Sequence, residues 1–77
     1  MTRRFLDDSL RHWEAFPSTG WQGVPRPALL VFDCLSDGRE PPRAVELDGT
    51  RAEVETRLTS MNDAELRELV ATAEPIR

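Results

Sequence analysis

Residues 28–35, Ala-Leu-Leu-Val-Phe-Asp-Cys-Leu, form the only long apolar run of this 77-residue chain. A short apolar run bounded by turn-forming residues is typical of a strand at the centre of a small core. Because successive side chains of a strand point to opposite faces, the run separates into two faces. The wholly apolar face, which we predict to be the core side, holds Ala28, Leu30, Phe32 and Cys34. The other face holds Leu29, Val31 and Leu35 and is interrupted by Asp33.

Two further strands are predicted beside this run. Residues 11–17 and residues 43–48 both alternate apolar and polar side chains, which favours half-buried strands. Residues 18–27 contain two glycines and two prolines and therefore read as a loop. Residues 1–10 fit either an arm or a short helix, because Leu6, Leu10 and Trp13 follow at helical spacing.

The C-terminal part carries two helix start signals. Thr50 followed by Glu53, and Asn62 followed by Glu65, each match a capping box, in which the two side chains satisfy each other's backbone amides. The first helix is predicted to end near Met61, and Pro75 stops the second.

These elements predict an α+β fold in which a small three-stranded antiparallel β-meander is followed by two short C-terminal α-helices packed on one face. We expect one small domain over residues 1–77. Within it, residues 1–10 form the arm or short helix, residues 11–48 the meander and residues 50–74 the helical pair.

Composition narrows the class of protein. The N-terminus has acids where a signal peptide needs an apolar core, and no run of about 18 apolar residues is present, so we expect a cytoplasmic protein without a membrane segment. All ten basic residues are arginine, which indicates a GC-rich, bacterial genome. The arginines do not cluster, and the net charge is −4, so nucleic acid is not an expected partner.

No residue pattern points to catalysis, a metal or a cofactor. Cys34 is expected in the core, without the base that a nucleophile needs. His12 is the only imidazole, so neither a histidine metal site nor a triad can be assembled. Asp33 is expected to meet solvent or an arginine such as Arg43 across the hairpin. We therefore expect a protein that is not an enzyme.

The second face of the central strand leads to the functional hypothesis. Two helices cover one side of such a sheet, so Leu29, Val31 and Leu35 need another cover. Either the N-terminal segment, through Phe5, Leu6 and Leu10, or a second copy across a two-fold axis supplies it. The leading hypothesis is a non-catalytic protein–protein interaction or regulatory module that forms a homodimer through this face or contacts a protein partner there or through the Trp21 loop.

The alternative is a module that binds a small ligand, such as a sugar, nucleotide or peptide, through the Trp/Gly/Pro loop. Trp21, Trp13 and Arg26 would form that site. Trp13 is better explained as a core residue, whereas Trp21 fits a recognition surface and a cap on the sheet edge equally well.

Overall fold

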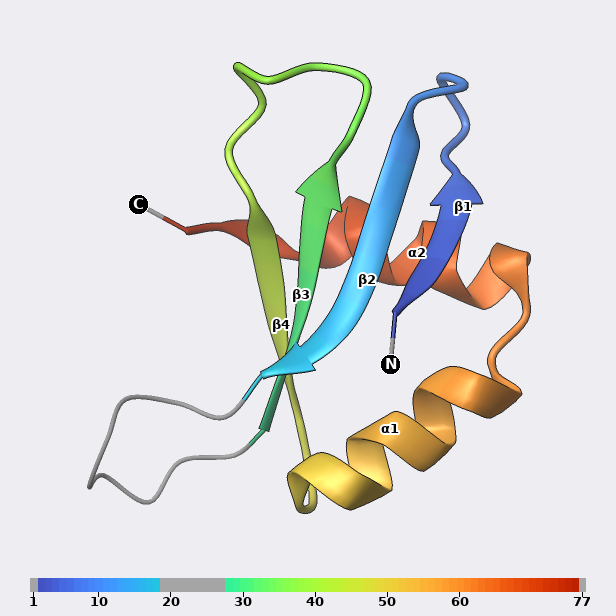
Figure 1. The fold of residues 1–77 in the computed structure, drawn as a ribbon, viewed down its shortest axis with the longest axis vertical. Helices are drawn as coiled ribbons and strands as arrows, with labels where there is room; N and C mark the ends of the chain where they lie inside the picture. Colours follow the sequence, from blue (N-terminus) through green and yellow to red (C-terminus); the bar gives the residue numbers. More distant parts are fainter. Residues whose placement is uncertain (1, 19–27, 77) are drawn as a thin grey trace.

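The computed structural model describes residues 2–18 and 28–76. In this part of the chain two helices follow four strands, and a short fifth strand comes last (Figure 1). The elements are β1 (Arg3–Leu6), β2 (His12–Ser18), β3 (Ala28–Cys34), β4 (Arg43–Leu47), α1 (Arg51–Ser60), α2 (Asp63–Thr72) and β5 (Glu74–Pro75).

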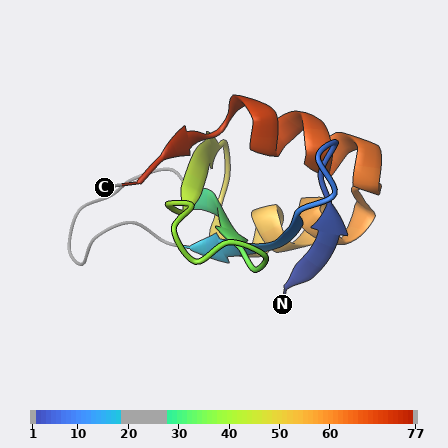
Figure 2. The same cartoon turned by 90° about the horizontal axis from the view of Figure 1, so that it is seen from above.

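The strands form one antiparallel sheet in the order β1-β2-β3-β4-β5. Both helices lie on the same side of this sheet (Figure 2). The predicted α+β class, with an antiparallel sheet and two helices, is confirmed. The predicted strand number of three is wrong, because β1 and β5 extend the sheet at its two edges.

The core lies between the helices and one sheet face, which we call the inner face. The central strand contributes its predicted side chains: Ala28, Leu30 and Phe32 are buried, and Cys34 is half-buried against the same cluster. Trp13 of β2 has no exposed surface, which confirms its assignment to the core. The helices complete the cluster with Val54, Leu58, Leu66 and Val70.

Both helices begin at the predicted capping boxes. The Thr50 hydroxyl accepts from the Glu53 amide at 3.2 Å, and the Asn62 side chain accepts from the Glu65 amide at 2.9 Å. In each box the glutamate carboxylate accepts from the amide of the cap residue. Met61 ends α1, as predicted.

The N-terminal segment is an edge strand rather than an arm or a short helix. Successive side chains of β1 alternate between the two faces of the sheet, and Phe5 is buried on the inner one. Its ring contacts that of Phe32 edge-on, with 5.9 Å between the ring centroids. The helical spacing of Leu6 and Leu10 has no counterpart in burial, because both side chains are exposed. Leu10 lies in the turn after β1 with φ of 63°. An aromatic contact with a residue far along the chain therefore outweighs the local pattern.

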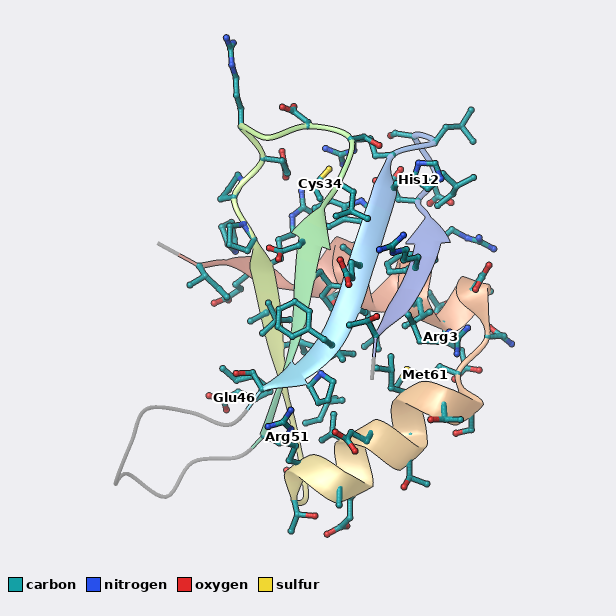
Figure 3. The ribbon with its side chains drawn as sticks, in the orientation of Figure 1. Arg3, His12, Cys34, Glu46, Arg51 and Met61 are labelled. Carbon is teal, nitrogen blue, oxygen red and sulfur yellow. The ribbon has the colours of Figure 1, made fainter. Side chains whose placement is uncertain are left out.

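Arg3 ties β1 to the turn between the helices. Its guanidinium donates to the carbonyls of Leu58 and Met61, both at 2.9 Å, and pairs with Asp63 at 3.4 Å (Figure 3). A cation at the C-terminus of α1 satisfies carbonyls that the helix leaves unpaired and interacts favourably with its dipole.

The second helix stops before the predicted boundary. Ala73 is its C-cap, and Glu74–Pro75 then pairs with β4 as the short strand β5. Proline is compatible with an edge strand because it needs no ladder donor there. Among the described residues, no helix has the length and apolar character needed to span a bilayer.

Candidate functional site

The sheet face opposite the helices, which we call the outer face, is the candidate site. No helix or strand of residues 2–18 and 28–76 packs on it. The strand register arranges its side chains in cross-strand rows. In the order of the strands, these rows are Leu6, His12 and Leu35; Arg4, Glu14 and Asp33; Phe16, Val31 and Ala44; and Ser18, Leu29 and Glu46.

The structure brings two of the predicted interface residues together. Leu29 and Val31 lie on the outer face of β3, where Leu29 is half-buried. Leu35 follows the end of β3 beyond the Asp33 row and is 49% exposed. The three residues therefore share a face but do not form one patch.

Val31 is only 8% exposed, although no helix covers it. It lies between Phe16 of β2 and Ala44 of β4 in the register. A charged substitution at Val31 would therefore disturb the folded monomer as well as any contact made by this face, since an unpaired charge at a buried position is costly. Phe16 is half-buried on the same row, and sequence reasoning did not select it.

The N-terminal segment does not cover this face, so that alternative is wrong. Phe5 points into the core, Leu6 belongs to the edge strand, and Leu10 is 76% exposed in a turn. β1 widens the outer face instead of shielding it.

The residues of the loop hypothesis are only partly testable. Trp21 and Arg26 lie outside the described residues, so a ligand site in their loop stays a prediction. Trp13 cannot serve as an open stacking platform there, because its ring is fully buried.

The second row of the outer face, Arg4, Glu14 and Asp33, is charged. Glu14 lies between Arg4 and Asp33, so one of its neighbours is a cation and the other is a second carboxylate. Like charges directly opposite each other weaken a strand pair. Asp33 faces away from the core, but the suggested contact with Arg43 is wrong. Arg43 pairs with Phe32 in the register and therefore lies on the inner face.

Arg43 belongs instead to a polar cluster around Trp13. Its guanidinium carbon lies 5.0 Å from the centre of the indole ring, and that of Arg11 lies 5.4 Å away. Glu40 links the two arginines, at 2.7 Å from Arg43 and 3.5 Å from Arg11. Cation–π contacts of this kind stabilise a ring that is shielded from water.

Asp7 is the acceptor at the centre of this cluster. Its Oδ2 accepts from the Trp13 indole at 2.7 Å and from Nε of Arg11 at 3.0 Å. Its Oδ1 accepts from the amides of Ser9 and Arg11. Burial alone would raise the pKa of Asp7, but the hydrogen bonds, led by that from Trp13, lower it to about 2. A carboxylate held ionised by four donors is a poor proton acceptor, so the cluster is structural.

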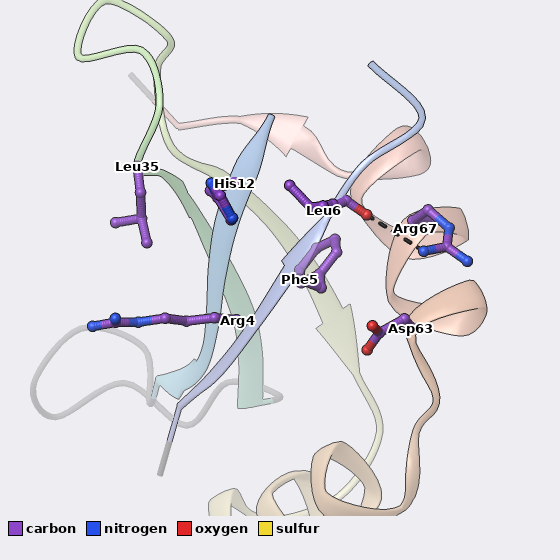
Figure 4. Close-up of a pocket in the computed structure, with 7 residues that line it drawn as sticks. All are labelled: Arg4, Phe5, Leu6, His12, Leu35, Asp63 and Arg67. Carbon is purple, nitrogen blue, oxygen red and sulfur yellow. Dashed lines mark hydrogen bonds between the residues drawn. The ribbon is translucent and has the colours of Figure 1, made fainter. Parts of the chain in front are cut away.

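A groove follows the free edge of β1, with a volume of about 580 Å³ (Figure 4). We call it the β1 groove, and its lining consists of Arg4, Phe5, Leu6, His12, Leu35, Asp63 and Arg67. It therefore joins one end of the outer face to the start of α2. Sequence reasoning missed it because it did not place residues 3–6 in the sheet.

Within residues 2–18 and 28–76, no group of three or more His, Cys, Asp or Glu side chains is placed to hold a metal ion. Comparison of the chain with protein families, curated proteins and solved structures finds no match. The site must therefore be interpreted from its own geometry.

Proposed function

We propose that this protein is a non-catalytic protein–protein interaction module that forms a homodimer through the outer face of its sheet. The observation that carries the proposal is the apolar row of Phe16, Val31 and Ala44, continued by Leu29, on a face that neither helix covers. Apolar residues gathered on a sheet face that no described helix or strand covers are typical of an interaction surface.

The order of charges favours a second copy as the partner. A two-fold axis that runs along β2 between two stacked outer faces places β1 of one copy over β3 of the other. Each Arg4 then faces Asp33 of the second copy, and Phe16 faces its own counterpart. Two contacts between Arg4 and Asp33 and the apolar contact of Phe16 are matched in this symmetric arrangement, while Glu14, on the axis, faces its own counterpart.

Leu35→Gln tests the proposal without adding a charge. Leu35 is 49% exposed in the monomer and faces Leu6 of the other copy across this axis, so the dimer interface gains about 1 kcal/mol from each copy of this side chain, or about 2 kcal/mol in total. The dimer dissociation constant should therefore rise about 30-fold in sedimentation equilibrium.

Leu10→Gln is the matched control, because it makes the same chemical change in the exposed turn after β1. It should leave the dissociation constant unchanged. A wild-type protein that stays monomeric at about 1 mM, or equal effects of the two variants, would contradict the proposal.

A further inference from the structure

The outer edge of β1 is an unpaired edge of the sheet. The Asp7 amide donates to the Arg11 carbonyl at 3.0 Å, so these two residues form a hydrogen-bonded pair. Pairs alternate along an antiparallel ladder, which makes Phe5 the next residue bonded to β2. The backbone groups of Arg4 and Leu6 therefore point away from β2. No strand of residues 2–18 and 28–76 pairs with them.

Side chains on both sides of this edge form the β1 groove. Arg4 and Leu6 lie on the outer-face side, and Asp63 and Arg67 of α2 lie on the other (Figure 4). Arg4 is exposed and makes no ion pair with any described residue. Arg67 contacts the Leu6 carbonyl at 3.5 Å and Asp8 at 3.9 Å, both at the limit of a polar contact. The groove thus offers backbone groups, the exposed apolar side chains of Leu6 and Leu35, and an unpaired cation.

We infer that the β1 groove binds an extended acidic peptide segment of a partner protein, which adds to the sheet as an antiparallel strand next to β1. Residues directly opposite in such a pair place their side chains on the same face. A partner residue opposite Leu6 is then apolar, and the residue two positions later, opposite Arg4, is Asp or Glu. Main-chain hydrogen bonds supply affinity, and these two side chains supply selectivity.

A peptide suits this edge better than a second copy does. A second copy joined through β1 would bring its own α2 to the same side of the sheet, beside the Asp63 and Arg67 that already line the groove. An isolated strand carries no second layer and avoids that conflict. This inference does not rest on the proposed homodimer, but both use the side chain of Arg4, so the peptide and the second copy compete for it.

The test uses the full chain and the capped peptide acetyl-Ser-Thr-Val-Thr-Glu-Thr-Ser-amide, in which Val would lie opposite Leu6 and Glu opposite Arg4. In ¹H–¹⁵N NMR titrations, the chemical shifts of the Arg4 and Leu6 amides should change on addition of peptide. The change should reach a plateau at about 1 mM peptide. A peptide with Lys in place of Glu should bind about fivefold more weakly. Methylation of the peptide backbone nitrogens should abolish binding, because it removes the donors of the new ladder.

Reversing the charge of Arg4 distinguishes specific recognition of the peptide by this residue from a general electrostatic attraction between peptide and protein. Arg4→Glu should reverse the preference between the Glu and Lys peptides, since Arg4 is exposed and its replacement leaves the core intact. Arg39→Glu makes the same charge change in the exposed turn before β4 and should keep the original preference. Leu29→Gln should leave peptide binding unchanged.

Three results would overturn the inference. The first is the absence of any chemical-shift change at about 1 mM peptide. In that case the charge of Arg4 prevents strand addition at this edge instead of recognising a peptide. The second is shifts confined to the outer face at Leu29. The third is an intermolecular NOE between the β1 backbones of two copies without peptide, which would make a second copy the occupant of this edge.

Discussion

Replacing Asp7 tests the account of how Trp13 is held. Asp7→Ala removes the hydrogen-bond acceptor of the Trp13 indole and of Arg11. Because the indole is buried, water cannot replace this acceptor. A buried donor left unpaired costs about 1 to 3 kcal/mol. With the loss of the two backbone caps at Ser9 and Arg11, we expect a total of about 2 to 4 kcal/mol. A domain of this size has only about 3 to 5 kcal/mol of stability, so the variant should be close to unfolding.

The lowered pKa of Asp7 gives the same prediction a pH signature. Its carboxyl titrates at about 2 in the folded protein and near 3.9 in the unfolded chain. The stabilisation is therefore complete above about pH 4 and is lost as the pH falls through 2. The side chain is 9% exposed, so solvent screens little of the effect, and we expect about 2 kcal/mol over this range. Asp7→Asn, which cannot ionise, should lack this acid dependence.

Urea unfolding followed by tryptophan fluorescence measures both effects. Asp8→Ala is the matched control, because the neighbouring Asp8 side chain is 95% exposed. It should change the free energy of unfolding by less than about 0.5 kcal/mol. If Asp7→Ala and Asp8→Ala were equally stable, or if Asp7→Asn kept the full acid dependence, the reasoning would be refuted.

Two further predictions concern the outer face and the helices. Glu14 lies on the proposed two-fold axis and faces its own copy, so Glu14→Gln should tighten the dimer about fivefold in sedimentation equilibrium; a weaker dimer would argue against that axis. Asn62→Ala removes the cap of α2 and should lower the free energy of unfolding by about 1 kcal/mol, whereas Ala64→Ser in the exposed first turn should change it by less than half as much. Equal losses in urea unfolding would show that the capping box contributes no stability of its own.

The features that sequence predicts well are those set by near neighbours. The two capping boxes each join residues three positions apart, and both form as expected. The alternation of β3 likewise determines which side chains enter the core, because strand geometry fixes the faces of consecutive residues.

The features that it misses depend on distant partners. Strand β1 forms because Phe5 meets Phe32 and because Arg3 reaches the end of α1, and no local pattern encodes these contacts. The Trp13 cluster likewise needs Arg43, thirty positions further along the chain. The turn residues around Asp7 were a usable signal, since Asp commonly caps its own turn.

The candidate site was predicted in the same partial way. The sequence places Leu29 and Val31 on one face, and the structure agrees. Val31 is 8% exposed and lies between Phe16 of β2 and Ala44 of β4 in the register, and its burial could not be read from β3 alone. The β1 groove was not predicted because the spacing of Leu6 and Leu10 favoured a helix or an arm, whereas the groove forms beside strand β1.

The most direct test of the central proposal is an isotope-filtered NOE experiment on a mixture of labelled and unlabelled protein, which detects only contacts between copies. Dimerisation through the outer face predicts intermolecular cross-peaks between the ring of Phe16 in one copy and that of the other, with further cross-peaks between the methyl groups of Leu6 and Leu35. A dimer whose intermolecular cross-peaks lie only at β1 or on the helices, or a sample with none at about 1 mM, would contradict it.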